Sequence, residues 1–312
     1  MIVRERPSGL RLFLLLRGSI LQRIRLMLLV NTLLALAVTL VHGHLFTLKV
    51  TLTPVPFTLI GLPLAIFLGF RNTAAYDRYW EARKLWGEIT LRLRTLSRQC
   101  QSLLALPALQ SPRSDDVRVR MVHRGIAFAH ALRLQLRGQS DAPLLQHWLG
   151  TKEWAQLQRQ RAALPDALLL VMGRDLGAEL RAGRIEPCLA AAVDATLSAL
   201  TAAAAACERI KNTPVPFSYT LLLHRTAYLY CFLLPFGLVD TVGFMTPFVV
   251  AIVAYTFFGL DAVGDELEEP FGLESNDLPL DTLCRGIEIS LLASLGETEL
   301  PAPLAPVDFQ LT

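Results

Sequence analysis

Eight acidic residues near the end of the chain are the side chains whose type and spacing best suit chemistry. They are Asp261, Asp265, Glu266, Glu268, Glu269, Glu274, Asp277 and Asp281. Carboxylate oxygens are the ligands that Ca²⁺ prefers, so this acidic segment could hold a divalent cation. The alternative is that the acids form a solvated face or pair with Arg71, Arg78 and Arg83, as charge runs commonly do. We favour the second interpretation.

Other reactive side chains do not form a recognisable site. His42 and His44 alternate in a short loop and could bind a metal, although a pair of surface histidines is the simpler interpretation. His224 beside Arg225 is interpreted as an anchor at a membrane interface. No Ser–His–Asp order, phosphate loop or metalloprotease signature stands out. The chain is therefore expected not to be an enzyme.

An apolar stripe precedes the first charged residues of the segment 56–86. Leu62, Ile66 and Phe70 are spaced by four residues, so they share one face of a helix. A helix that is apolar at membrane depth and then turns polar could line a path, if several copies of the chain came together. The alternative is that the stripe packs against a neighbouring helix, which periodicity alone favours.

A polar stripe continues the same helix face. It consists of Thr73, Asp77, Glu81 and Lys84, which we interpret as pore-lining positions. A single helix cannot enclose a path, so this interpretation requires several copies of the chain. The acids outnumber the base, which favours cations over anions.

The composition indicates a membrane protein. Of the 312 residues 53% are hydrophobic and 18% are charged, and the mean hydropathy is +0.41, which is too apolar for an ordinary soluble domain. The net charge of +3 is too small to indicate nucleic-acid binding. The five cysteines form no CxxC pair and are interpreted as reduced.

The pattern of apolar runs predicts an all-α protein with four membrane spans. Residues 1–23 are expected to form an interfacial helix, residues 24–71 the first two spans, and residues 218–260 the last two. Between them, residues 72–217 contain no segment that we judge apolar enough to cross a bilayer. Four helices are predicted there, at Tyr76–Leu104, Val117–Leu136, Leu168–Arg181 and Cys188–Ile210. Residues 261–312 comprise the acidic segment and a Pro-rich tail.

Basic residues predict the orientation. Four arginines precede the first span, at positions 11, 17, 23 and 25, and basic residues follow the second span, whereas both outer loops are nearly free of Lys and Arg. The positive-inside rule therefore places both termini and residues 72–217 in the cytoplasm.

Three separated motifs resemble the bestrophin family, in particular its bacterial branch. They are FLGFRNTAAYDRYWEARKLWGEI at 67–89, PFSYTLLLHRTAYLY at 216–230 and ELEEPFGLESNDLPLD at 266–281. The resemblance implies an all-helical homopentameric ion channel whose partners are its own copies, membrane lipids and the permeant ions. It also implies that Leu62, Ile66 and Phe70 form a narrow neck, which reverses the preference for simple packing.

Two further sites follow only from the resemblance. A cytosolic aperture is implied in the segment GRIEPCL, where Ile185, Cys188 and Leu189 all remain candidates. Eukaryotic bestrophins bind calcium through a dense acidic run after PFG, but here only Glu274 and Asp277 are charged in the segment LESND. This departure argues against calcium activation, so no cofactor is assigned beyond a divalent cation that the acidic segment could hold.

The sequence leaves alternatives open both for the conducted ion and for the class of function. Resemblance to bacterial members, together with the acidic stripe, favours cations, whereas eukaryotic members conduct chloride, so an anion channel of the same architecture is the alternative. A membrane-anchored scaffold or sensor without a pore, or an intramembrane enzyme that uses the acids with a metal, are alternatives of other classes.

Overall fold

The computed structural model describes residues 1–4, 9, 18–41, 44–45, 48–49, 53–107, 116–159 and 163–312. These residues are helical or irregular apart from two short strands, β1 (His44–Leu45) and β2 (Leu48–Lys49), which pair antiparallel. The all-α prediction is confirmed. The chain divides into two compact units. We call residues 4–79 and 214–270 the membrane unit, and residues 1–3, 80–213 and 271–312 the second unit.

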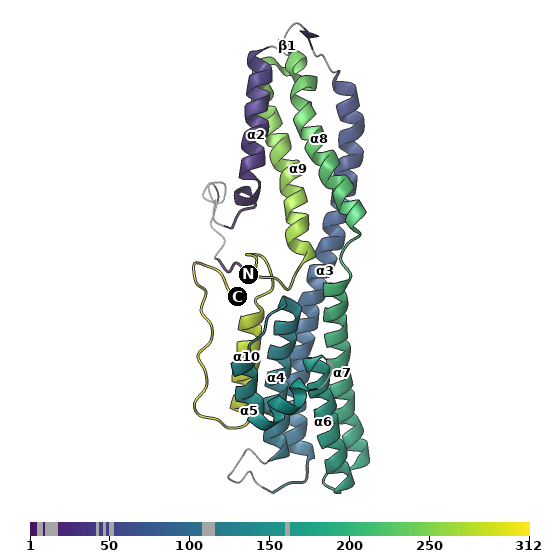
Figure 1. The fold of residues 1–312 in the computed structure, drawn as a ribbon, viewed down its shortest axis with the longest axis vertical. Coiled ribbons are helices and arrows are strands. Elements are labelled where there is room, and N and C mark those ends of the chain that lie inside the picture. Colours follow the sequence, from purple (N-terminus) through teal and green to yellow (C-terminus); the bar gives the residue numbers. More distant parts are fainter. Residues whose placement is uncertain are drawn as a thin grey trace. The chain divides into compact units, whose positions relative to one another are not determined.

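Among the residues that the structure describes, four helices belong to the membrane unit, and Figure 1 labels them. They are α2 (Leu21–Leu40), the first part of α3 (Pro54–Leu103), α8 (Phe217–Val242) and α9 (Thr246–Glu268), with the 3₁₀ turn η2 (Gly243–Met245) between the last two. The helix predicted to continue without a break from the second span past Arg71 is therefore observed. The last two spans extend beyond the apolar runs at 227–239 and 243–260 and so reach lengths that can cross a bilayer.

The helices of the membrane unit approach each other closely in its core. Phe57 of α3 packs with Leu234 of α8 and Val250 of α9. Gly237 of α8 lies against the Phe57 ring so closely that a Cβ atom would stand 2.2 Å from it. Glycine is therefore required there because no side chain fits.

The second unit contains the remaining helices. They are α4 (Val117–Arg137), α5 (Ala142–Gln158), α6 (Leu164–Arg181), α7 (Pro187–Asn212), α10 (Leu280–Ser294) and the later part of α3. The Asp116 side chain accepts a hydrogen bond from the Arg118 N–H and caps α4, while Gly138 ends this helix at φ +63°. The helices predicted at 117–136, 168–181 and 188–210 are all present.

Helices α5 and α10 were not predicted. Gly150 has φ +71° and interrupts α5, so no long periodic pattern marks it. Helix α10 follows Pro279 in a stretch that composition alone assigns to the acidic segment. Both helices are held by packing within the second unit, which periodicity does not reveal.

Four stretches of the described residues are long and apolar enough to span a membrane. They are Leu21–Leu40, Pro54–Leu103, Pro187–Asn212 and Phe217–Glu268, the last of which comprises α8 and α9. The expectation that no such stretch lies between Arg71 and Phe217 is therefore wrong by this criterion. The stretch is α7. Its many alanines raise the mean hydropathy, although an alanine side chain has little surface to bury.

The interfacial helix predicted for residues 1–23 falls largely outside the described residues, as do His42 and residues 111–115. At its start, Ile2 forms an antiparallel bridge with Gln310, and the Val3 N–H donates to the Phe309 carbonyl at 2.8 Å, whereas residues 21–23 already belong to α2. The Pro-rich tail at 301–306 has no regular secondary structure.

Candidate functional site

The apolar stripe on α3 faces away from the other described helices. Leu62, Ile66 and Phe70 are 67%, 48% and 63% exposed. The opposite face is buried, because Leu64 and Leu68 pack against α8 residues in one cluster. Packing against another described helix of the same chain therefore does not explain the stripe, and its three side chains are available to line a path or to contact another copy.

The polar stripe is less acidic than its composition suggests. Thr73, Asp77 and Lys84 are exposed, but the Glu81 carboxylate accepts a hydrogen bond of 2.6 Å from Arg209 of α7. This arginine was not part of the sequence argument. Because it offsets one of the two acids, the remaining charges on the stripe are Asp77 and Lys84, and the electrostatic preference for cations disappears.

The three aperture candidates lie in different environments. Ile185 is 4% exposed and packs within the second unit, whereas Cys188 is exposed at the start of α7 and Leu189 is half-buried. Gly183 adopts φ +68° at the turn between α6 and α7, which places this segment after a tight reversal. Only Cys188 and Leu189 reach the surface.

A buried arginine marks the end of the apolar part of α3. The Arg71 side chain is 0% exposed and its Nη1 donates to Asp261 Oδ1 at 2.8 Å. Its Nη2 also donates to Asp265, and Glu268 Oε2 lies 3.7 Å from it. The ion-pair interpretation of the acidic segment is confirmed for Arg71, since a buried guanidinium needs such partners.

Arg78 and Arg83 were also expected to pair with the acids, but the contacts described for them are of other kinds. Arg78 Nε donates to the Glu268 carbonyl oxygen at 3.2 Å, and the Arg83 guanidinium lies 5.3 Å from the centre of the Trp80 ring. The acidic segment gains Arg23 as a further partner, with its Nη1 3.7 Å from Glu266 Oε1.

His224 belongs to the same cluster. Its Nδ1 lies 2.6 Å from Asp261 Oδ2, so one carboxylate contacts both His224 and Arg71. The sequence interpretation of this histidine as an interfacial anchor missed this contact, because α8 and α9 approach only in the folded unit.

Glu274 and Asp277, the acids after Phe271 that could take part in a divalent-cation site, come together in one turn. The Asp277 carboxylate accepts a hydrogen bond from the Glu274 N–H at 2.7 Å and closes a turn. In the part of the chain that the structure describes, no group of three or more His, Cys, Asp or Glu side chains could hold a metal ion.

Asp281 serves a structural role in the second unit. It accepts hydrogen bonds from Arg133 and from Arg137, the latter at 2.7 Å, and so joins α10 to α4. Burial alone would raise the pKa of this carboxyl, but the hydrogen bond and charge of Arg137 and the charge of Arg133 outweigh it and leave the pKa lowered.

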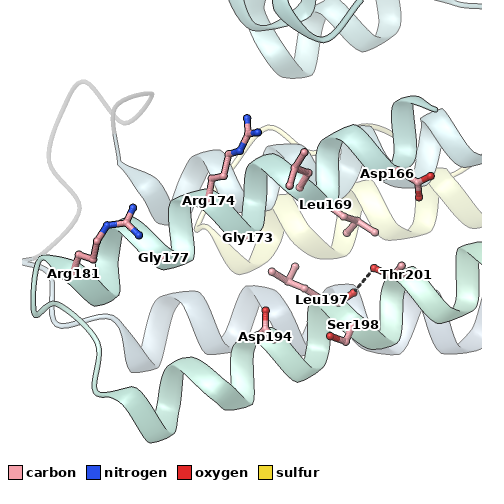
Figure 2. A pocket seen from close by; sticks show the side chains of 11 residues that line it. Asp166, Leu169, Gly173, Arg174, Gly177, Arg181, Asp194, Leu197, Ser198 and Thr201 are labelled. Atoms are coloured by element: carbon pink, nitrogen blue, oxygen red, sulfur yellow. Dashed lines mark hydrogen bonds between the residues drawn. The ribbon is translucent and has the colours of Figure 1, made fainter. Parts of the chain in front are cut away.

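A groove between α6 and α7 was also absent from the sequence analysis. Figure 2 shows it over Gly173 and Gly177, with Leu197 and Ser198 on the facing helix, and its volume is about 590 Å³. Its charged lining residues, Asp166, Arg174, Arg181 and Asp194, are of both signs. The groove depends on how two helices pack, which no local pattern in the sequence encodes.

Comparisons with known proteins place the chain in one family. A family model described as "Bacterial/Fungal Bestrophin protein" matches residues 1–293. A crystal structure of a bacterial bestrophin homolog from Klebsiella pneumoniae is 38% identical, has a TM-score of 0.83, and covers 88% of this chain and 100% of that one.

Similar full-length relatives carry functional names. Proteins called "Voltage-dependent anion channel-forming protein" from Escherichia coli K12 and Mesorhizobium japonicum are both 44% identical, over 100% and 99% of this chain and 100% and 96% of their own lengths. One from Synechocystis is 33% identical over 88% of each chain. These names favour anions, against the cation preference drawn from the acidic stripe.

Proposed function

Because this chain belongs to the bestrophin family, we propose that it assembles as a homopentamer whose pore passes monovalent ions across a bacterial inner membrane. At the coarser level the protein is a membrane ion channel and not an enzyme. The observation that carries the proposal is the exposed apolar stripe of α3 opposite a buried face. Five copies of this stripe around one axis would form a neck.

Leu62, Ile66 and Phe70 line the neck in this proposal. Rings of such side chains make a narrow path that conducts poorly when it is dry. Cys188 and Leu189 are the aperture candidates that reach the surface. Both termini and the second unit lie in the cytoplasm, as the distribution of Lys and Arg predicts.

Anions are the favoured ions. The names of the relatives support this choice, and the pairing of Glu81 with Arg209 removes the main argument for cations. Asp77 still supports a cation channel, since it is an exposed acid on the polar stripe.

The first experiment measures reversal potentials of the purified protein in a planar bilayer under a salt gradient. A potential near the chloride equilibrium value supports an anion channel, and one near the cation value reverses the ion assignment while keeping the channel.

Substitution of the neck tests the pore itself. We expect Leu62, Ile66 and Phe70 changed together to Ala to raise conductance severalfold, because a wider and less apolar neck holds water more readily. Ile60→Ala is the matched control, since Ile60 is an exposed apolar residue of α3 outside the stripe. Equal currents from the native protein, the triple variant and Ile60→Ala would show that these three residues do not form the neck.

A further inference from the structure

Basic residues follow the polar stripe along α3. Lys84, Leu91 and Arg98 come after Asp77 at intervals of seven residues, which is about two turns of a helix, so all four share one face. Arg94 precedes Arg98 by four residues and lies on this face as well. We call Lys84, Arg94 and Arg98 the basic stripe. The predicted pore-lining positions end at Lys84 and do not include the two arginines.

The basic stripe lies on the exposed face of α3 in the second unit. All three of its residues are exposed, and Leu91 between them is 55% exposed. The opposite face of the same part of α3 is buried in the core of the second unit, where Trp86 and Leu93 are at most 1% exposed. Packing against the described helices of the same chain therefore does not account for the basic stripe.

Positive charge predominates on this part of α3. Between Trp80 and Leu103 the charged residues are Arg83, Lys84, Arg92, Arg94 and Arg98 with only two acids, Glu81 and Glu88. Both acids are engaged, Glu81 with Arg209 at 2.6 Å and Glu88 with Arg92 at 2.5 Å. Within the described parts of the chain, the guanidinium groups of Arg94 and Arg98 form no hydrogen bond or ion pair. Their charges are therefore not neutralised by this chain.

An exposed guanidinium suits a small anion that passes without being held. It is always charged, it presents several N–H donors, and it is more weakly hydrated than an ammonium group. Charges of one sign along an aqueous path raise the local concentration of ions of the other sign. Basic rings in a pore therefore favour anions over cations. The basic stripe fits small inorganic anions such as chloride.

We propose that Arg94 and Arg98 form two basic rings in the assembled channel and determine its preference for anions. This inference rests on the proposed channel function, because rings exist only where copies of α3 surround a path. Helix α3 is continuous from Pro54 to Leu103, so the face that carries the neck residues continues into the basic stripe. Asp77 is offset on the same face by Lys84, and the two arginines set the sign of the charge beyond them.

The test is the ratio of chloride to potassium permeability, obtained from reversal potentials in planar bilayers under a potassium chloride gradient. Arg94→Gln combined with Arg98→Gln removes both charges and keeps polar side chains. We expect the ratio to fall about fivefold at about 0.1 M salt, where a charge acts over a Debye length of about 10 Å. The difference from the native protein should nearly disappear at about 1 M salt, where this length is about 3 Å.

Two further double variants serve as controls. Lys152→Gln combined with Arg159→Gln removes the same charge from exposed residues at α5 of the second unit, and we expect it to keep the native permeability ratio. Arg94→Lys combined with Arg98→Lys keeps the charge of the basic stripe, so most of the anion preference should remain. Unfolding temperatures in detergent should match that of the native protein in every variant, because the substituted side chains are exposed.

Several results would overturn the proposal. An unchanged permeability ratio in the glutamine variant of Arg94 and Arg98 removes the basic rings and leaves the channel in place. An equal fall in the α5 variant, or an equal fall when lysine replaces the two arginines, does the same. A native channel that prefers cations also overturns the proposal. A native protein that passes no current removes the channel function and the basic rings together.

Discussion

The two units of the protein distribute buried charge in opposite ways. In the second unit, ion pairs join helices at separate places, for example Arg124 with Glu153 and Asp175, and Arg137 with Asp281. In the membrane unit, by contrast, several ion pairs gather in one cluster around Arg71 and Asp261. Dispersed pairs act nearly independently, whereas members of one cluster depend on each other.

The cause of the difference is the environment of each unit. The apolar helices α2, α8 and α9 offer few polar partners, so a charge can be buried only where several opposite charges meet it. In the second unit, the acids that contact Arg124 are about one-fifth exposed and keep contact with solvent. The loss of a single residue should therefore cost more in the membrane unit.

The largest expected effect comes from Arg71→Met. It leaves Asp261 buried next to further carboxylates without its guanidinium, and loss of one partner of a buried pair costs about 3–5 kcal/mol. Thermal unfolding in detergent measures the loss. Arg124→Met is the counterpart in the second unit and should cost about 1–3 kcal/mol, because its acids can be solvated. Equal losses of stability in Arg71→Met and Arg124→Met would contradict the proposed difference between the two units.

A smaller effect is expected from Gly264→Ala, which tests how tightly the cluster is packed. The new Cβ would lie 2.5 Å from Asn72 Oδ1, and forced overpacking costs about 1–3 kcal/mol. At Gly69 of the same unit a Cβ would meet no atom within 4 Å, so Gly69→Ala is the control. Similar unfolding temperatures for the two variants would show that the residues around Gly264 can make room for a methyl group without loss of stability.

The smallest effect is expected from Asp281→Asn in the second unit. Loss of its charge-assisted hydrogen bonds to Arg133 and Arg137 should cost about 1–2 kcal/mol at pH 7. The lowered pKa of Asp281 means that its contribution is full above the ordinary value of 3.8 and disappears as pH falls below it. Native and variant proteins should therefore unfold at temperatures that converge as pH falls from 3.8 through the lowered pKa of Asp281, and a gap that does not narrow there would rule out this ion pair as the cause.

Periodicity and composition were sufficient for much of the fold. The continuous helix past Arg71 and the helix from Val117 follow from unbroken patterns with clear boundaries. The short helix α5 could not be found in this way, since Gly150 divides it. Helix α8 extends past its apolar run at both ends and α9 extends past the C-terminal end of its run, because packing extends helices into polar sequence.

The candidate site was only partly predictable. Spacing by four residues identified Leu62, Ile66 and Phe70 as one face, but their exposure depends on which face the chain buries. Nothing local in the sequence links His224 to Asp261, which are 37 residues apart. The partner of Glu81 is even more distant, so the charge on the polar stripe could not be counted correctly before the fold was known.

The bridge between Ile2 and Gln310 has a consequence for the path of the chain through the bilayer. Two segments that hydrogen-bond to each other must lie in the same aqueous compartment, so the number of crossings between them must be even. Among the described helices, α2, α3, α8 and α9 would give four crossings. Counting the alanine-rich α7 as well would give five and would place the two bonded ends on opposite sides. The bridge therefore favours α7 as a helix that stays outside the bilayer, despite its hydropathy.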